Sequence, residues 1–178
     1  MCSYKIENKI FEKYISALEL KKAVGDIAKR INEDYKGKEI LFIVVLNGAF
    51  MFASDLFKQT KVSCKISFVK VSSYNNENST GKFKQLIGLN ENIKDKNVII
   101  VEDIVDSGFT MLNIREQLLM QEPNNLEIAT LLLKPLKFQQ KYPIKYIGMN
   151  IENPFIVGYG LDFNGYGRNL PDIYQIKG

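Results

Sequence analysis

The chain has 178 residues, 46% of them hydrophobic and 25% charged, which fits one globular domain with a full core. Its net charge of +4 comes from basic residues scattered along the chain, which favours small anionic ligands and argues against a nucleic-acid partner. The chain has no histidine and two cysteines, which excludes a histidine base and argues against both tetrahedral zinc and a disulfide-built scaffold.

Helix and strand patterns alternate in the first third of the chain. Ser16 and Glu19 have the spacing of a capping box, and apolar residues follow at helical intervals up to a stop near Gly37. The continuously apolar run Ile40–Leu46 predicts a strand that is buried on both faces. A helix from about 49 to 58 is expected to follow it.

A strand and a polar stretch occupy the middle of the chain. Residues 64–72 alternate in part between polar and apolar side chains, which predicts a strand more exposed than the first. The stretch 72–84 is rich in Asn and Ser, so we expect a mobile loop there. Another strand near 85–89 is expected to return from the loop.

The second half of the chain repeats the alternation of strands and helices. Residues 97–101 form a fully apolar strand, Ser107-Gly108 breaks it, and 111–120 predict a helix. A third buried strand is expected over 127–133 and a short fourth over 146–149. This order predicts a mainly parallel sheet of the doubly wound type, with ligands bound beyond the carboxyl ends of its strands.

The most informative segment is Val98–Leu112, VIIVEDIVDSGFTML. A buried strand runs into Glu102 and Asp103, and residues 106–110 then open a helix, so hydroxyls and backbone N–H groups surround a helix N-terminus. That arrangement binds phosphate, and the paired carboxylates suit sugar hydroxyls or a magnesium ion carried with a diphosphate. A lone acidic-Ser-Gly turn would more often only cap its helix, but the full string is much more specific.

The string VIIVEDIVDSGFT resembles the phosphoribosyl pyrophosphate motif of the purine phosphoribosyltransferases, and the remaining landmarks resemble the hypoxanthine-guanine branch in the same order. The resemblance covers roughly residues 40–176. It implies the type I phosphoribosyltransferase fold, an α/β fold whose mainly parallel twisted sheet is flanked by helices, with a small hood formed by terminal segments. One domain would then span residues 1–178, with a core at about 16–145 and a hood from 1–15 and 146–178.

The resemblance implies a role for each residue of the motif. Glu102 and Asp103 would hold the ribose hydroxyls and Mg2+, and Asp106 would be the base that receives or positions the purine N7 proton. The 5-phosphate would be cradled by Ser107, Gly108, Phe109 and Thr110. A carboxylate at Asp106 is also the one plausible base in a chain without histidine.

The same resemblance assigns the pyrophosphate contacts. Asn47 and Gly48 follow the first buried strand and resemble the pyrophosphate loop, although Asn-Gly is also a common turn dipeptide. The family often has lysine in place of Asn47, which leaves the backbone N–H groups for this contact. Arg168 would bind pyrophosphate through its guanidinium fork, and Asp162 would ligate a second Mg2+; as isolated residues, both would be interpreted as a surface ion pair.

For the purine, the resemblance points to Lys134, whose ammonium group donates to a 6-oxo group but cannot accept from the amine of adenine. Tyr146 would place an aromatic ring over the base, although aromatic residues in such strands are usually core. Ile147 and Asp162 would lie near the 2-position of the base. Ser73 and Tyr74 resemble the start of a lid that keeps water from the ribosyl cation.

The implied activity is transfer of 5-phosphoribosyl from phosphoribosyl pyrophosphate (PRPP) to N9 of hypoxanthine, and of guanine as well. The products are IMP or GMP and pyrophosphate, in purine salvage with Mg2+ as cofactor. We expect a homodimer or homotetramer. Without a signal peptide or an apolar run near the ~20 residues of a membrane span, we expect a cytoplasmic protein with no membrane partner.

Three alternatives stay open at this point. A relative specific for xanthine would share every motif and differ only in contacts to the 2-position of the base. A regulatory protein that senses nucleotides and binds RNA would need a basic face, which the scattered charge does not favour. A doubly wound nucleotide-binding module without catalysis would leave Lys134, Asp162 and Arg168 unexplained.

Overall fold

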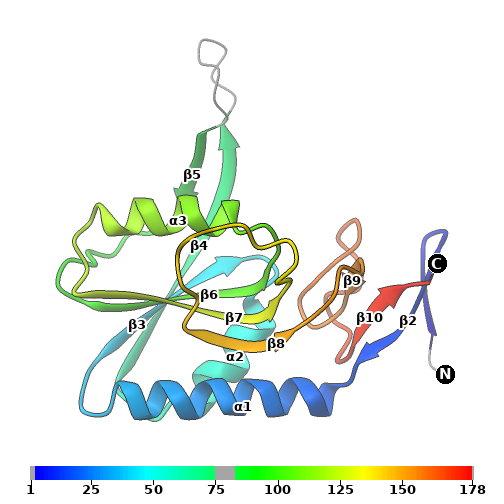
Figure 1. Ribbon diagram of the computed structural model, residues 1–178, viewed down its shortest axis with the longest axis horizontal. Coiled ribbons are helices and arrows are strands. Elements are labelled where there is room, and N and C mark those ends of the chain that lie inside the picture. Colours follow the sequence, from blue (N-terminus) through cyan, green and yellow to red (C-terminus); the bar gives the residue numbers. More distant parts are fainter. Residues whose placement is uncertain (1–2, 75–82, 178) are drawn as a thin grey trace.

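The larger of two sheets forms the centre of the molecule in the computed structural model, which describes residues 3–74 and 83–177. Its strand order is β5-β4-β3-β6-β7-β8. The strands are β3 (Ile40–Leu46), β4 (Cys64–Tyr74), β5 (Phe83–Ile87), β6 (Asn97–Val105), β7 (Asn125–Leu133) and β8 (Tyr146–Asn150). Every neighbouring pair is parallel except β4 and β5, which are antiparallel. The predicted mainly parallel sheet is confirmed (Figure 1).

Helices cover both faces of this sheet because its central strands are apolar on both sides. Alternate residues of β3, Phe42 and Val44, pack in one cluster with α1 (Ala17–Asp34) and α2 (Phe50–Gln59). The residues between them pack with α3 (Phe109–Leu119), and Figure 1 shows α1 and α3 on opposite sides of the sheet. None of the described helices has both the length and the hydrophobicity that a membrane crossing requires.

The predicted capping box at the start of α1 is confirmed. Ser16 Oγ accepts from the backbone N–H of Glu19 at 3.3 Å, and Ser16 N–H donates to Glu19 Oε2 at 2.9 Å. This pair of bonds satisfies donors that a helix N-terminus would otherwise leave free. The helix then ends at Asp34, shortly before Gly37, whose φ of 74° is in the left-handed region.

Two predicted boundaries were wrong because strand pairing continues beyond the local pattern. β6 extends to Val105, where it pairs with Leu133 of β7, so both acidic residues lie inside the strand and not after it. The predicted loop over 72–84 is shorter, since Tyr74 pairs with Phe83 at the end of the antiparallel β4–β5 ladder. The remainder of that predicted loop, including Ser79, lies outside the described residues.

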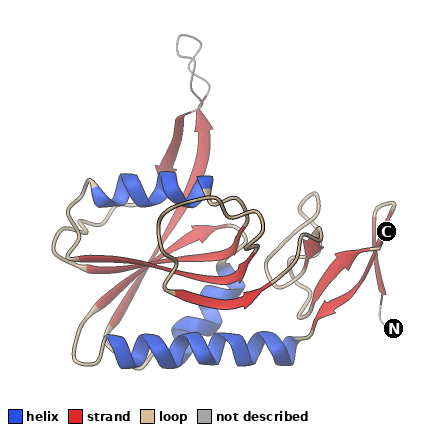
Figure 2. Cartoon of the chain, viewed as in Figure 1, coloured by secondary structure: helices blue, strands red, loops and turns tan. Residues whose placement is uncertain are grey.

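A second, smaller sheet joins the two ends of the chain, and we call it the hood. Its strands, in the order β1-β2-β10-β9, are β1 (Ser3–Ile6), β2 (Lys9–Ile15), β10 (Ile173–Ile176) and β9 (Ile156–Val157). Phe11, Val157 and Tyr174 form part of its own small core. Figure 2 shows the hood as strands and loops beside one end of α1. The predicted hood boundary at residue 146 was wrong, because β8 pairs with β7 in the main sheet.

Candidate functional site

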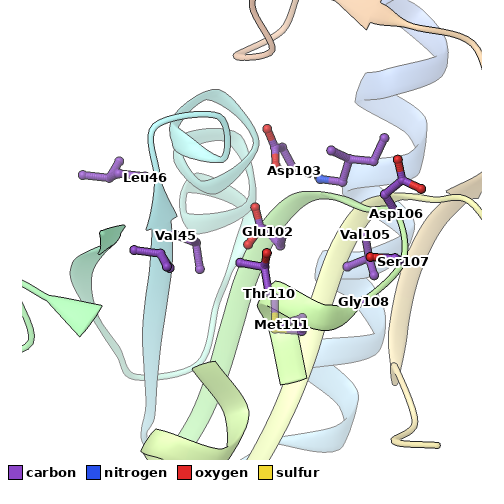
Figure 3. A pocket seen from close by; sticks show the side chains of 12 residues that line it. Val45, Leu46, Glu102, Asp103, Val105, Asp106, Ser107, Gly108, Thr110 and Met111 are labelled. Carbon is purple, nitrogen blue, oxygen red and sulfur yellow. Dashed lines mark hydrogen bonds between the residues drawn. The ribbon is translucent and has the colours of Figure 1, made fainter. Parts of the chain in front are cut away.

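A cavity of about 300 Å³ lies at the carboxyl ends of β3 and β6. Its lining includes Leu46, Glu102, Asp103, Ser107 and Thr110, which come from the two strands and from the start of α3 (Figure 3). In parallel sheets, ligands bind at this edge because the loops after the strands meet there. The structure thus brings most of the residues of the predicted phosphoribosyl motif together around one space.

The turn formed by residues 106–110 places a helix N-terminus at the cavity. Gly108 is the N-cap of α3, and its φ of 82° is in the left-handed region that favours glycine. The first N–H groups of a helix have no partner within the helix, and together with its dipole they attract an anion. Phe109 contributes only its backbone, since the residue is 56% exposed and does not line the cavity.

Glu102 and Asp103 form a carboxyl pair with raised proton affinity. Burial raises the pKa of Glu102 well above its usual range, and the neighbouring Asp103 charge raises it further. Burial also raises the pKa of Asp103, although the Ile104 N–H and the positive charge of Arg168 work in the opposite direction. The pair therefore favours a ligand that supplies positive charge or hydrogen-bond donors.

Mg2+ is the cation that this donor set fits. Mg2+ prefers oxygen ligands and is commonly bound through one or two carboxylates together with phosphate oxygens and water. Among the described residues, no group of three or more acidic, histidine or cysteine side chains could hold a metal by itself. A magnesium ion at Glu102 and Asp103 would therefore take its remaining ligands from a bound diphosphate, a sugar or water.

We predict that Glu102→Gln makes the metal-free protein more stable at neutral pH while activity falls. A raised carboxyl pKa in the folded state means that stability decreases as pH rises from the ordinary glutamate range through the raised pKa. The amide has no charge to bury, so its advantage in melting temperature grows across that pH window. Thermal melts of both proteins over the window measure this, with the exposed Glu116→Gln as control; equal melting curves for Glu102→Gln and wild type would contradict the prediction.

The loop after β3 is in close contact with the carboxyl pair and with the hood. A Cβ atom on Gly48 would lie 1.7 Å from Asp103 Oδ2, and a Cβ atom on Gly160 would lie 2.0 Å from the Gly48 carbonyl oxygen. Arg168 Nη1 donates to the Gly160 carbonyl oxygen at 2.7 Å. Gly160 thus contacts both Gly48 and Arg168, the residues of the two predicted pyrophosphate contacts. Asn47 is exposed.

Asp162 is paired with Arg168 in the hood. The distance from Arg168 Nη2 to Asp162 Oδ1 is 2.6 Å, and the Gly165 N–H donates to Asp162 Oδ2 at 2.7 Å. Both carboxylate oxygens are therefore bound by donors of the protein itself. In this arrangement Asp162 orients the guanidinium group, and a metal ion at Asp162 would first have to displace it.

A lysine pair faces the carboxylate of Asp106. Lys134 Nζ lies 3.5 Å and Lys137 Nζ 3.4 Å from Asp106 Oδ2. The Lys134 side chain is 9% exposed, and its ammonium group also donates to the Pro154 carbonyl oxygen at 3.2 Å. The other carboxylate oxygen, Asp106 Oδ1, is buried without a hydrogen-bond partner among the described residues. A buried acceptor of this kind is suited to a donor on a ligand.

The interpretation of Tyr146 as a ring over the base is contradicted by the structure. The residue is fully buried, and its hydroxyl donates to Asp34 Oδ2 at 2.7 Å. It pairs with Ala129 in the middle of β7, its ring is packed under Arg30 of α1, and it does not line the cavity. Ile147 follows it in β8, paired with Thr130, and does not line the cavity.

Phe155 is an exposed aromatic residue near Lys134 that the sequence motifs did not indicate. It follows Pro154, whose carbonyl accepts from Lys134, and it is 47% exposed at the start of the hood segment. Its ring centroid lies 6.4 Å from that of Phe11 and 5.8 Å from that of Phe163, so one side of the ring is supported by the hood. Its neighbour Pro154 contacts Lys134, but the sequence alone does not show which segment of the chain reaches Lys134.

We predict that Phe155→Ala raises the KM for the purine that the sequence resemblance implies, whereas Tyr146→Phe lowers only stability. Loss of base stacking on an aromatic ring costs roughly tenfold in affinity. Tyr146→Phe removes the hydrogen bond to Asp34 of α1, a residue that does not line the cavity, and should lower the melting temperature without changing KM. Steady-state kinetics with varied purine, beside thermal melts, separate the two effects; an unchanged purine KM in Phe155→Ala would refute the assignment.

The two predicted lid residues, Ser73 and Tyr74, lie in the part of β4 that pairs with β5. Val71, two residues before Ser73, lines the cavity. The rest of the predicted lid lies outside the described part of the chain.

Comparisons with known proteins give a consistent picture. The model of the phosphoribosyl transferase domain matches residues 13–164. The chain is 39% identical over 168 residues to the hypoxanthine phosphoribosyltransferase of Escherichia coli (strain K12), covering 93% of this chain and 94% of that protein. It is 36% identical to the hypoxanthine-guanine phosphoribosyltransferase of Staphylococcus aureus (strain Mu50), covering 97% of each. A crystal structure of a hypoxanthine-guanine phosphoribosyltransferase from Bacillus anthracis superposes with a TM-score of 0.86 at 39% identity, covering 93% of this chain and 98% of that one.

Proposed function

This chain belongs to the phosphoribosyl transferase family, and from that membership we propose that it transfers the 5-phosphoribosyl group of PRPP to N9 of hypoxanthine. Guanine is the second expected acceptor, and the products are IMP or GMP and pyrophosphate. The observation that carries the proposal is one cavity that combines a helix N-terminus with the carboxyl pair of half-buried Glu102 and buried Asp103. The type I fold predicted from the sequence is confirmed by the similarity to solved hypoxanthine-guanine enzymes.

PRPP binding uses the two sides of the cavity. Its 5-phosphate binds the backbone N–H groups that begin α3 and the hydroxyls of Ser107 and Thr110. Its ribose hydroxyls donate to Glu102 and Asp103, which also favour the positive charge that develops on the ribose as the bond to pyrophosphate breaks. When bound at these two carboxylates, Mg2+ supplies positive charge that neutralises the pyrophosphate leaving group.

Pyrophosphate is expected between the 47–48 loop and the hood. The backbone N–H groups of Asn47 and Gly48 are its donors on one side. Arg168 is the donor on the other side, where its side chain is bound to the carbonyl of Gly160, which contacts Gly48. A second Mg2+ at Asp162 requires that Arg168 leave that carboxylate for the pyrophosphate, since the two side chains are paired. The guanidinium fork suits either partner because two of its N–H groups can donate to two oxygens of a carboxylate or of a phosphate group.

The purine is placed by the lysine and the carboxylate beside the 106–110 turn. Lys134 donates to the 6-oxo group, and Asp106 Oδ1, which is buried and lacks a described partner, accepts the N7 proton. An ammonium group cannot accept from an amine, so this contact selects 6-oxopurines and rejects adenine. Phe155 covers the face of the base from the hood side.

The remaining parts of the proposal concern the whole molecule. Residues 1–178 act as one domain, and Ser73 and Tyr74 belong to a lid that keeps water from the ribosyl group. We expect the protein to self-associate as a dimer or tetramer. Sedimentation analysis of the purified protein measures this state directly.

A base-competition assay tests the proposed function. Purified protein is incubated with PRPP, Mg2+ and equal concentrations of hypoxanthine, guanine, xanthine and adenine, and the nucleotides are separated by chromatography. We expect IMP and GMP, with no AMP. Preferential formation of XMP would favour the xanthine alternative. Absence of every nucleotide product, together with salt-dependent RNA binding, would overturn the proposal in favour of a regulatory protein.

A further inference from the structure

The 106–110 turn is contacted from outside the cavity by the β7–β8 loop (residues 134–145). Tyr142 donates its hydroxyl to the Gly108 carbonyl oxygen at 2.8 Å, and Gln140 Nε2 donates to the Ser107 carbonyl oxygen at 3.3 Å. The same loop supplies Lys134, which contacts the base in the proposed function. One loop therefore contacts both the acceptor side and the phosphate side of the site.

These two bonds orient the N–H groups that would bind phosphate. In a trans peptide unit the C=O and N–H bonds point in opposite directions within one plane. A donor that holds the Ser107 carbonyl therefore orients the N–H of Gly108, and a donor that holds the Gly108 carbonyl orients the N–H of Phe109. The Gly108 carbonyl also accepts the Leu112 N–H at 2.9 Å, so two donors hold this peptide unit.

The Tyr142 side chain is itself held in one position. The residue is 7% exposed, and its ring makes an edge contact with Phe138 at a centroid distance of 5.3 Å. Arg115 of α3 lies over the ring, with its guanidinium carbon 6.0 Å from the ring centroid. The contact with Gly108 is close, because a Cβ atom added there would lie 2.8 Å from the Tyr142 hydroxyl oxygen. A donor fixed in this way can hold a peptide plane through each turnover.

We propose that Tyr142 and Gln140 are positioning residues, which orient the N–H groups of the 106–110 turn for the 5-phosphate of the ribosyl donor. The inference rests on the proposed function for the identity of that ligand. Neither side chain is expected to touch the substrate, because both act on carbonyl groups of the turn. Their removal should weaken binding of the phosphate without changing recognition of the purine.

The test compares Tyr142→Phe with Tyr35→Phe. Tyr35 is also buried and hydrogen-bonded through its hydroxyl, but its partner is Asn125 at the start of β7, the end of that strand opposite the cavity. Binding of ribose 5-phosphate is measured by calorimetry, and KM values for PRPP and hypoxanthine are measured with Mg2+ present. Loss of one hydrogen bond that orients a binding group corresponds to roughly a fivefold loss of affinity.

We expect Tyr142→Phe to raise both the Kd for ribose 5-phosphate and the KM for PRPP about fivefold. The KM for hypoxanthine and kcat at saturating PRPP should stay near the wild-type values, and Tyr35→Phe should leave all four quantities unchanged. Gln140→Leu, a change at a half-buried position, should weaken phosphate binding in the same direction. Wild-type affinity for ribose 5-phosphate in both loop variants would overturn the inference.

The calorimetric readout separates this inference from the proposed function. If the wild-type protein binds ribose 5-phosphate but forms no IMP, the proposed activity fails while the binding comparison still tests the loop. A variant that is only partly folded would lose kcat and keep its KM values. That result, like an equal loss in Tyr35→Phe, would assign Tyr142 a purely structural role and would contradict the inference.

Discussion

Asp106→Asn is expected to lower kcat for IMP formation by a factor on the order of 10² to 10⁴, the range of general acid–base catalysis. The carboxylate has one oxygen held by Lys134 and Lys137 and a second, buried oxygen without a described partner. Asparagine keeps the shape of the side chain but loses the charge, so it cannot receive a proton from purine N7. The KM for PRPP should change much less, because the cradle residues are intact.

The matched control for this substitution is Asp34→Asn. Asp34 is also paired with a lysine, Lys145, at 3.0 Å, but it lies at the C-terminal end of α1 beside Tyr146, opposite the cavity. The control should keep its turnover even if its melting temperature falls. Steady-state rates and thermal melts of both variants distinguish lost chemistry from lost folding. Near-normal turnover in Asp106→Asn would show that another group handles the N7 proton.

Gly48→Ala is expected to lower kcat/KM for PRPP by roughly 10²-fold, because displacement of a catalytic group by about 1 Å has an effect of that order. The added Cβ would lie 1.7 Å from Asp103 Oδ2 and 2.6 Å from its Cγ. Asp103 is 7% exposed, and its Oδ1 accepts a hydrogen bond from the Ile104 N–H at 2.8 Å. Either the carboxyl group turns out of the cavity or the 47–48 loop moves, and both outcomes disturb PRPP binding.

The control for Gly48→Ala is Gly25→Ala in the middle of α1. A Cβ atom at Gly25 would be 3.4 Å from its nearest neighbour, Gln59 Oε1, which is ordinary contact. Alanine is also the better helix former, by about 1 kcal/mol, so this variant should keep activity and gain some stability. Kinetics with varied PRPP and thermal melts measure both proteins. An active Gly48→Ala enzyme with wild-type KM for PRPP would show that the 47–48 loop does not face the donor.

Much of the fold was predictable because its signals are local. The capping box of Ser16 and Glu19 involves residues three apart, and the apolar run of β3 reports burial on both faces directly. The order of strands and helices then permits few arrangements, since parallel strands need crossover connections of one hand. The helix-opening turn at 106–110 was equally readable, as Ser, Gly and Thr follow an apolar strand within one short string.

The less accurate predictions depended on partners distant in the chain. β6 ends at Val105 and not at residue 101 as predicted, because β7 continues to pair with it. The residues of β6 alone do not indicate that pairing. Tyr146 was assigned to the base because of its position in the order of motifs. Its burial against α1 became apparent only when Asp34, distant in sequence, proved to be its hydrogen-bond partner.

The amino-acid sequence by itself determined the elements, the class of sheet and the chemistry available at the end of β6, because periodicity, capping and turn formation act over a few neighbouring residues. Tertiary structure alone decided which distant segments meet that chemistry. It packs Gly160 against the carbonyl of Gly48. It also brings the Pro154 carbonyl to the Lys134 ammonium group and the Tyr142 hydroxyl to the Gly108 carbonyl. Such contacts are set by the packing of the whole chain, since a side chain's direction relative to a distant segment depends on every element between them.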